Sequence, residues 1–428
     1  MRISVRGGTV FTMTDRGILT EAEVTVEEGL VCTVGEIPPD WQPDLVVEAA
    51  GCAVLPGLVN THTHAAMTLL RGYADDQPLM PWLERKIWPA EARLDGEDVY
   101  WGTLLAAVEM LSSGTTTFAD MYFFMEDVGR AVSETGMRAV LSRGLIGTAP
   151  NAQEALAEGV DFARRWQGAA GGRIRTMLGP HAPYTCPPEY LRQVAQAARS
   201  EGLGVHIHLS ETRGELEECL RHHGVTPVAL LDQVGLLELP LLAAHCVHLA
   251  SDDYGLLNRA NVGVAHNPVS NLKLGSGVAP LAALLREGVR VGLGTDGAAS
   301  TNSLDLFQEL RLAALLAKGM TGEPTAVTAL QALELATVGG ARALGMEDVI
   351  GRISPGYAAD LITVDLTAPH LVPVHDPASA LAYAATGRDV RTVLVDGRVV
   401  VDRGAVQTVD VERVCREAKR RAARLVAP

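Results

Sequence analysis

Cysteines and long apolar runs are scarce in this chain of 428 residues. The six cysteines form no CxxC pair, so a disulfide framework is not expected and the thiols are predicted to be reduced. No apolar run reaches the roughly 18–20 residues that span a bilayer, and the first residues lack the apolar core of a signal peptide. These absences predict a cytoplasmic protein with no segment in a membrane.

Positive charge is also in short supply. The chain has 36 lysines and arginines against 51 aspartates and glutamates, which gives a net charge of −15 at pH 7. Such a surface repels phosphate backbones, so nucleic acid is not an expected partner. The remaining composition, 47% hydrophobic and 20% charged, excludes wholesale disorder and is sufficient for a large core.

The hydrophobic pattern divides the chain into three parts. The first 55 residues indicate short strands separated by turns, whereas residues 56–347 alternate strand-like runs with long helical stretches. This alternation is typical of βαβ units around a parallel sheet. After residue 348 the pattern returns to strands, with a hairpin turn at Asp396 and Gly397, and ends in a helix over about residues 410–425.

Eight strand-like runs can be counted in the middle part of the chain. They are residues 53–60, 115–120, 138–143, 173–179, 204–209, 241–245, 262–266 and 289–295. Most are nearly continuous in apolar or small residues, which suits strands buried on both faces, and eight strands close a barrel. We therefore expect an α/β protein: a (β/α)8 TIM-like barrel over residues 56–347, beside a small β-sandwich domain built from residues 1–55 and 348–428.

Polar side chains able to do chemistry follow these predicted strands at their carboxyl ends. They are His62, His64, Asp120, Arg143, His181, His206, His208, Glu211, His245, His266 and Asp296. In a (β/α)8 barrel these strand ends form one face, and that face carries the active site. Seven of the twelve histidines belong to this group, which a random scatter would not produce.

The spacing of His62 and His64 indicates a metal site. Alternate residues of a strand point to the same side, so the pair can bind one ion together, and imidazole suits zinc, iron and similar metals. A third histidine from another strand and Asp296 would complete a site that leaves one position open for water. His206 and His208 form a second such pair, of which only one is expected to be a ligand.

Two further residues are suited to proton transfer beside a metal. Glu211 lies where the fifth predicted strand gives way to a loop, and a carboxylate there can shuttle a proton. His245 follows the sixth strand and could hold or deprotonate a water at the metal. Each candidate has a structural alternative: Glu211 a solvated charge at a helix start, His245 a hydrogen-bonded core residue, and Asp296 a helix N-cap.

Short motifs along nearly the whole chain carry a family resemblance. They are PGLVNTHTH at residues 56–64, MTLLRG at 67–72, PAE at 89–91, GTTT at 114–117, GPHAPY at 179–184, HLSE at 208–211, AHCVH at 244–248, HNPVSNLKLG at 266–275 and GTDGAAS at 294–300. Together they resemble the amidohydrolase superfamily, and within it the 5′-methylthioadenosine/S-adenosylhomocysteine deaminase group.

The resemblance implies a metal centre and a reaction. His62, His64, His208 and Asp296 would bind one divalent ion, usually zinc and in some relatives iron, with His206 a neighbour and not a ligand. Many binuclear hydrolases of this fold hold two metals with a bridging carboxylated lysine, but the first four predicted strands end in no lysine, which favours a single ion. The implied reaction is hydrolytic removal of the 6-amino group of adenosine-type nucleosides, giving the inosine analogue and ammonia.

The resemblance also implies roles for catalytic residues. Glu211 would present a proton to N1 of the purine, and His245 and Asp296 would hold the attacking water and accept its proton. Glu211 or Asp296 would then deliver the proton with which ammonia leaves, so both also contact the substrate.

Three more residues are implied to bind the substrate. Glu91 resembles a carboxylate that grips the ribose hydroxyls, and Arg143 and His181 resemble further contacts. Glu91 could instead be a solvated helix-start charge, and Arg143 a structural ion-pair partner. Family members that accept S-adenosylhomocysteine carry an arginine in the loop after the third strand, whereas residues 144–153 contain none. This departure favours 5′-methylthioadenosine, adenosine or 5′-deoxyadenosine.

Two rival interpretations stay open. Guanine-type and 8-oxoguanine-type deaminases share much of the implied metal site, and a fold does not fix a substrate. Glu91 separates them, because its implied role exists only where the substrate carries a sugar. The second rival is a non-catalytic barrel that serves as a scaffold, which has no reason to keep the implied ligands. Homo-oligomers are common among the resembled enzymes, so a homo-oligomer is a further expectation.

Overall fold

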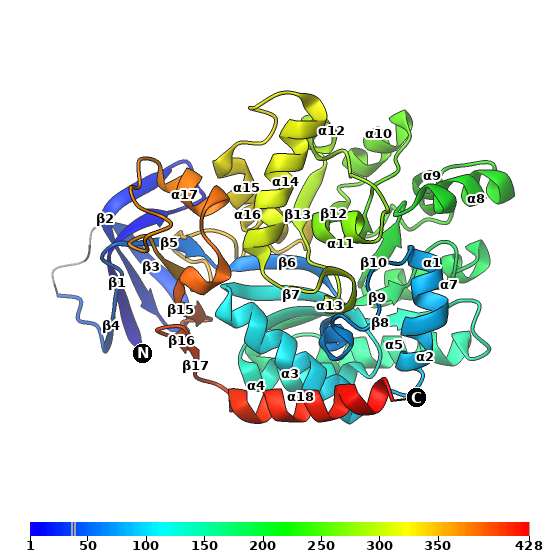
Figure 1. The fold of residues 1–428 in the computed structure, drawn as a ribbon, viewed down its shortest axis with the longest axis horizontal. Coiled ribbons are helices and arrows are strands. Elements are labelled where there is room, and N and C mark those ends of the chain that lie inside the picture. The colour runs from blue at the N-terminus through cyan, green and yellow to red at the C-terminus, as the bar shows by residue number, and fades with distance from the viewer. Residues whose placement is uncertain (36, 38–39, 428) are drawn as a thin grey trace.

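The computed structural model describes residues 1–35, 37 and 40–427, and a barrel of eight parallel strands lies at its centre (Figure 1). The strands are β6 (Leu58–Thr63), β7 (Thr115–Tyr122), β8 (Arg138–Leu145), β9 (Ile174–Pro180), β10 (Gly204–Leu209), β11 (Leu241–His245), β12 (Gly263–His266) and β13 (Arg290–Leu293). Each is hydrogen-bonded to the next in chain order. The backbone N–H of Asp296, just after β13, donates to the carbonyl of His62 in β6 at 2.9 Å, which brings the first and last strands together. The predicted (β/α)8 barrel is confirmed.

The first predicted run, residues 53–60, belongs to two different strands. β5 (Cys52–Pro56) pairs within a second sheet, and the barrel begins only at Leu58. The residue between them is Gly57, where an added Cβ would lie 2.1 Å from Thr116 Oγ1, so a larger residue does not fit. The chain passes from one sheet to the other at this glycine, a change that a continuous apolar run does not reveal.

Helices cover the outside of the barrel (Figure 1). The helical elements up to the end of the barrel are η1 (Ala65–Leu70), α1 (Leu79–Trp82), the π-helical η2 (Leu83–Ile87), α2 (Trp88–Glu91), α3 (Gly96–Ser112), α4 (Met125–Thr135), α5 (Ala152–Trp166), α6 (Ala169–Gly172), α7 (Pro188–Glu201), α8 (Arg213–His223), α9 (Pro227–Gln233), α10 (Ser251–Arg259), α11 (Pro268–Lys273), α12 (Leu281–Arg286), α13 (Ala298–Thr301), α14 (Leu306–Thr321), α15 (Ala329–Leu335) and α16 (Val338–Ala343). Local sequence explains where several begin. The side chain of Asp95 accepts the N–H of Asp98 at 2.8 Å and Asp98 accepts that of Asp95 at 3.0 Å, a capping box that starts α3.

The two ends of the chain build a second sheet beside the barrel. Its strands are β1 (Arg2–Phe11), β2 (Ile18–Glu27), β3 (Leu30–Gly35), β4 (Leu45–Glu48), β5, β14 (Leu361–Asp365), β15 (Val390–Val395), β16 (Arg398–Asp402) and β17 (Ala405–Val406), with α17 (Pro377–Tyr383) and η3 (Gly387–Asp389) between β14 and β15. β5 pairs antiparallel with β14, Leu55 opposite Ile362, so the strand that leads into the barrel also joins the two ends. Apolar side chains from both ends share one core, which includes Ile3, Val5, Val24, Leu361 and Leu394. The predicted small β domain made from both chain ends is confirmed, and its strands form one sheet.

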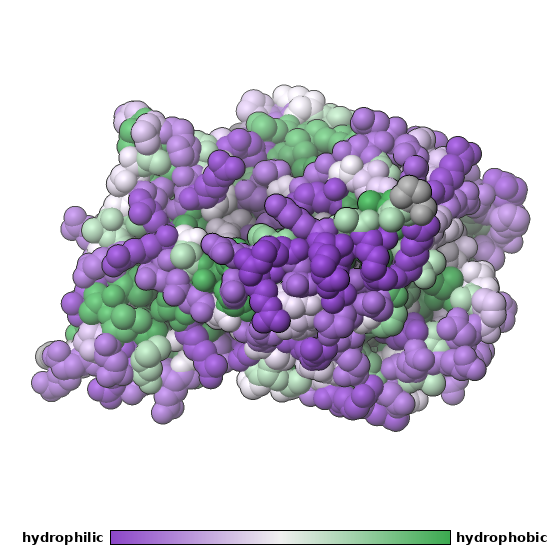
Figure 2. All heavy atoms as spheres, turned by 60° about the horizontal axis from the view of Figure 1, so that its bottom comes forward, coloured by the Kyte–Doolittle hydropathy of each residue, from purple (hydrophilic) through white to green (hydrophobic). Residues whose placement is uncertain are grey.

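Ion pairs connect the barrel to the rest of the chain. At the start of β8, Arg138 donates from Nε to Asp360 Oδ2 at 2.8 Å and from Nη2 to Oδ1 at 3.1 Å, and the two side chains are only 4% and 3% exposed. The last helix, α18 (Val411–Leu425), lies against α3, where Arg421 Nη1 is 3.0 Å from Asp98 Oδ1. Figure 2 shows hydrophilic side chains gathered over this side of the molecule. Within the described part of the chain, no helix combines the length and the hydropathy needed to cross a membrane.

Candidate active site

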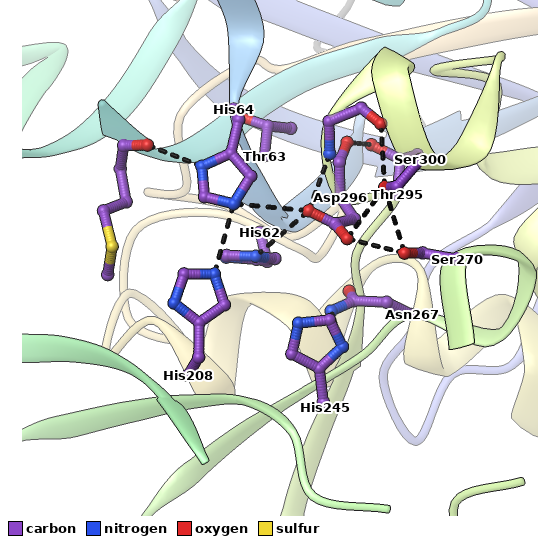
Figure 3. A network of polar contacts seen from close by, with 12 residues as sticks. His62, Thr63, His64, His208, His245, Asn267, Ser270, Thr295, Asp296 and Ser300 are labelled. Atoms are coloured by element: carbon purple, nitrogen blue, oxygen red, sulfur yellow. Dashed lines mark hydrogen bonds and ion pairs between the residues drawn. The ribbon is translucent and has the colours of Figure 1, made fainter. Parts of the chain in front are cut away.

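Four side chains from three different strands of the barrel meet at its carboxyl-end face (Figure 3). His62 lies on β6 and His64 follows that strand directly, His208 lies on β10, and Asp296 follows β13. Nε2 of His64 is 3.1 Å from Nε2 of His208. Asp296 Oδ1 lies 3.5 Å from His62 Nε2 and 3.3 Å from His64 Nε2. The structure therefore brings together the four residues that the resemblance implies as ligands.

Backbone carbonyls fix the protonation of two of these histidines. Nδ1 of His64 is 2.6 Å from the carbonyl of Met121, and Nδ1 of His208 is 2.7 Å from the carbonyl of His181. A carbonyl only accepts hydrogen bonds, so each neutral ring carries its proton on Nδ1 and presents a bare Nε2. Two bare nitrogens 3.1 Å apart repel each other unless a cation lies between them. This donor set fits a metal ion.

A longer hydrogen-bond chain fixes the third histidine. The Ser142 hydroxyl donates to the carbonyl of Asp120 at 2.7 Å and therefore accepts from Nδ1 of His206 at 3.2 Å. Nε2 of His206 is then bare and accepts from Nδ1 of His62 at 2.8 Å. The remaining nitrogen of His62, Nε2, is buried with no hydrogen-bond partner in the described chain. Burial lowers the pKa of His62 to about 4, which keeps the ring neutral.

The Asp296 carboxylate is held by donors on its far side. Its Oδ2 accepts the hydroxyls of Ser270 at 2.6 Å and Ser300 at 2.9 Å, and its Oδ1 accepts the N–H of Gly297 at 2.7 Å. The backbone of Asp296 is left-handed, with φ at 65°, a conformation that side-chain-bearing residues seldom adopt and that the surrounding structure must stabilise. Zinc and iron both accept imidazole and carboxylate ligands. The site offers both kinds, in the imidazoles of His62, His64 and His208 and in this carboxylate.

Glu211 and His245 face each other beside this cluster. Glu211 Oε2 lies 3.8 Å from His245 Nε2, and Glu211 Oε1 accepts the hydroxyl of Ser276 at 3.1 Å. Nδ1 of His245 donates to Asn271 Oδ1 at 2.8 Å, so its Nε2 is free to accept a proton. Burial raises the pKa of Glu211, which favours the protonated acid. One group suited to donate a proton and one suited to accept it thus lie side by side.

A cavity leads from this cluster towards the α1–α2 segment. Its polar lining comprises His64, Glu91, Tyr122, His181, Tyr184, His208, Glu211, His245 and Asp296. Its apolar lining comprises Met67, Leu79, Trp82, Leu83, Trp88, Met121, Phe123, Ile146 and Leu274. Tyr122 donates from its hydroxyl to Glu91 Oε1 at 2.7 Å, and burial raises the pKa of Glu91 to about 7. Of the two interpretations of Glu91, the structure thus favours a carboxylate inside a cavity over a solvated charge.

Arg143 is a predicted substrate contact that the structure does not bring into the cavity. Its Nη2 lies 2.7 Å from Glu158 Oε2 on α5, and its Nη1 donates to the carbonyl of Gly144 at 2.9 Å. Successive strand residues point to opposite faces, and Ser142 points inward to His206, so Arg143 points outward to the helices. These contacts agree with the alternative role given to Arg143 in the sequence analysis, that of a structural ion-pair partner.

Several residues of the site carried no signal in the sequence. Ser142, Tyr122 and Ser276 each orient one of the groups above, but nothing in their local sequence identifies them as partners. Asn271, which orients His245, lies within the motif at residues 266–275, but the motif gave it no role. Asp120, which the strand-end pattern did single out, accepts the Thr63 hydroxyl at 2.9 Å and lines no part of the cavity. Alternation along the predicted strand at residues 138–143 shows only that Ser142 and Arg143 point to opposite faces.

The fold and the site together define a class of protein. A parallel (β/α)8 barrel with reactive side chains at the carboxyl ends of its strands is an enzyme architecture, and a histidine–aspartate donor set beside an acid–base pair is typical of a metal-dependent hydrolase. The chain belongs to the amidohydrolase family, whose model matches residues 53–400.

Curated relatives and solved structures narrow this placement. The chain is 52% identical over 428 residues to a 5-methylthioadenosine/S-adenosylhomocysteine deaminase of Pelotomaculum thermopropionicum, with 99% of each chain covered. It is 50% identical over 428 residues to a 5′-deoxyadenosine deaminase of Methanosarcina acetivorans, covering 99% of this chain and 98% of that one. An adenosine deaminase of Xanthomonas campestris with bound zinc has a TM-score of 0.93 at 36% identity and 99% and 98% coverage. The family resemblance predicted from the motifs is confirmed.

Proposed function

We propose that this enzyme removes the 6-amino group of adenosine-type nucleosides by hydrolysis, giving the inosine analogue and ammonia. The observation that carries the proposal is that one cavity is lined by Glu211 and His245 and also by Glu91. A purine ring needs the first pair for its chemistry, and a ribose needs a carboxylate such as Glu91 to accept its hydroxyls. The relatives that are named as nucleoside deaminases support the same substrate class.

One divalent metal ion belongs to this proposal. His62, His64, His208 and Asp296 would hold it, and zinc is the best supported ion because the related adenosine deaminase contains it. When bound, such an ion lowers the pKa of a water molecule towards neutrality and so supplies the nucleophile. The bare Nε2 atoms of the three histidines and the anchored carboxylate suit this role without rearrangement.

The protein's own groups supply the proton transfers. Glu211, whose pKa is raised by burial, donates a proton to N1 of the purine, and the protonated ring becomes electrophilic at C6. His245 accepts the proton of the attacking water at Nε2, because its Nδ1 is committed to Asn271. Asp296 takes the second proton of the water and delivers it to the departing amino group, and the proton held by His245 returns to Glu211, which restores the acid for the next turnover. Ser276 holds Oε1 of Glu211 during these steps, so that Oε2 stays turned towards His245.

The cavity wall favours a small, uncharged 5′ substituent. None of its lining residues is a lysine or an arginine, and Leu79, Trp82 and Leu83 supply apolar surface. A methylthio group, a hydroxyl or a hydrogen can occupy such a site at little cost, whereas the zwitterionic homocysteine of S-adenosylhomocysteine would lose hydration without gaining a partner. We therefore infer a preference for 5′-methylthioadenosine, adenosine or 5′-deoxyadenosine.

A single set of assays tests this function. Turnover of 5′-methylthioadenosine, adenosine, S-adenosylhomocysteine, free adenine and guanine is followed by the absorbance change of the purine, on samples whose metal content is measured. Rapid turnover of the first two nucleosides and weak turnover of free adenine are expected. Preferential turnover of guanine would favour a guanine-type deaminase instead, and metal-loaded protein inactive on all five would contradict the proposal. A preference for S-adenosylhomocysteine would refute the inference from the apolar wall alone.

A further inference from the structure

A buried carboxylate lies directly behind the proposed proton donor. Glu215 is the third residue of α8, and it is 6% exposed. Its Oε1 accepts the backbone N–H of Ser210 at 2.8 Å, and its Oε2 accepts that of Glu211 at 2.8 Å. Both oxygens of one side chain therefore hold the two residues with which the chain leaves β10.

Helix capping does not account for these contacts. Thr212 is the N-cap of α8 and its hydroxyl accepts the N–H of Glu215 at 3.2 Å, the first half of a capping box. In a capping box the glutamate accepts the N–H of the N-cap residue in return. Glu215 instead passes over Thr212 and binds the N–H groups of the two residues before it. The side chain is thus directed at the loop rather than at the helix end.

The backbone of this loop depends on such a partner. Ser210 has a left-handed conformation, with φ at 52°, which is unfavourable for a residue with a side chain. Successive N–H groups around a left-handed residue point the same way and form an anion-binding concavity. The carbonyl of Ser210 accepts the N–H groups of Val247 at 3.0 Å and His248 at 2.9 Å, so the loop is held from both sides.

We propose that Glu215 is a positioning residue, which places the Glu211 carboxyl for proton transfer by filling the concavity at Ser210 and Glu211. The peptide that Glu215 holds sets the direction in which the Glu211 side chain leaves the backbone. That direction brings Glu211 to Ser276 on one oxygen and towards His245 on the other. This inference rests on the proposed function insofar as it takes Glu211 to be the proton donor.

A glutamine at this position tests the clamp with little change of volume. In Glu215→Gln one acceptor becomes an NH₂ group that faces a backbone N–H, so one of the two hydrogen bonds is lost. Because displacing a catalytic group by about 1 Å can lower the rate about 100-fold, kcat for 5′-methylthioadenosine is expected to fall about 10–100-fold. KM is expected to change by less than about threefold, and metal content to stay that of the wild type, because no metal-binding or sugar-binding group is touched. Glu217→Gln, at an exposed position of the same helix, is the matched control and is expected to retain wild-type kinetics.

A double-mutant cycle separates positioning from general damage. If Glu215 acts through Glu211, adding Glu215→Gln to Glu211→Gln lowers kcat no further, within about twofold, because the group to be positioned is already inactive. If Glu215 had only a structural role, the losses in kcat from Glu215→Gln and Glu211→Gln would multiply in the double variant. Glu215→Asp, which shortens the side chain by one methylene, supplies the same cycle if the glutamine variant does not fold. The inference would be overturned if Glu215→Gln and Glu215→Asp both kept wild-type kcat. It would also be overturned if the losses in kcat of the two single variants multiplied fully in the double variant. Failure of the wild-type enzyme to deaminate any adenosine-type nucleoside would instead overturn the proposed function, which is a separate outcome of the same measurements.

Discussion

Replacing His206 tests the hydrogen-bond chain that fixes the protonation of His62. His206→Phe keeps an aromatic ring but removes the acceptor that lies 2.8 Å from His62 Nδ1. His206→Gln is the matched control, because its amide oxygen extends to the position of the lost Nε2 and still accepts. The two variants differ mainly in whether the proton of His62 is held away from the metal site.

The size of the expected loss in zinc binding follows because no other group in the described chain replaces His206 as a hydrogen-bond partner of His62. Nε2 of His62 has no hydrogen-bond partner there, and Nδ1 has only His206. Loss of such an outer partner typically weakens metal binding about 10–100-fold, which corresponds to about 1.4–2.7 kcal/mol at 25 °C. That range agrees with the roughly 1–3 kcal/mol for a buried donor left without a partner. We expect the zinc dissociation constant to rise about 10–100-fold in His206→Phe and less than about fivefold in His206→Gln.

The assay is a competition for zinc between apo-protein and a chromophoric chelator, with thermal unfolding of each apo-protein as a check on folding. Activity is not needed for this measurement, so it stands apart from the substrate assignment. Zinc binding of wild-type strength in the phenylalanine variant would refute the reasoning. An equal loss in both variants would also refute it, since the effect would then follow from altered packing and not from the acceptor.

Four further outcomes follow from the site and the fold. Glu211→Gln is expected to lower kcat about 10²–10⁴-fold with metal content unchanged; near-normal turnover in a steady-state assay would contradict the proton role. Because burial raises the pKa of Glu91 to about 7 and its ionised form is the better acceptor, kcat/KM for nucleosides should increase as pH rises through about 7. Tyr122→Phe removes a hydrogen bond that lowers this pKa, so the midpoint of the pH profile should shift upward, and an unchanged midpoint would argue against the pairing. Arg138→Met leaves Asp360 buried and unpaired, so urea unfolding should show a loss of about 3–5 kcal/mol, and less in a variant that also carries Asp360→Asn.

The strand pattern predicted the barrel because its strands are buried on both faces. The run at residues 241–245, for example, is nearly continuous in apolar residues and coincides with β11. The same property hides which side chains face inward, because both faces are apolar. Arg143 shows the consequence: its place at a strand end suggested the cavity, and only the inward direction of its neighbour Ser142 excludes it.

The metal-ligand candidates were accessible from the sequence because each lies at or just beyond the carboxyl end of a barrel strand. Their orienting partners were not, because those come from elements distant in the chain. Ser276 reaches Glu211 across 65 positions of sequence, and Ser142 reaches His206 across 64. Such pairs depend on how far each loop extends over the barrel mouth, which composition and periodicity do not encode.

The pairing of β5 with β14 has a consequence for how the protein is made. β1 to β5 are synthesised before the barrel, but the strand that covers the edge of β5 lies roughly 300 residues later, at Ile362 opposite Leu55. Until then β5 presents unpaired N–H and C=O groups, the kind of edge that invites pairing with another chain. A contact of such long range also slows folding. The N-terminal strands of this enzyme should therefore be the segment that most needs protection by chaperones while the barrel is still being synthesised.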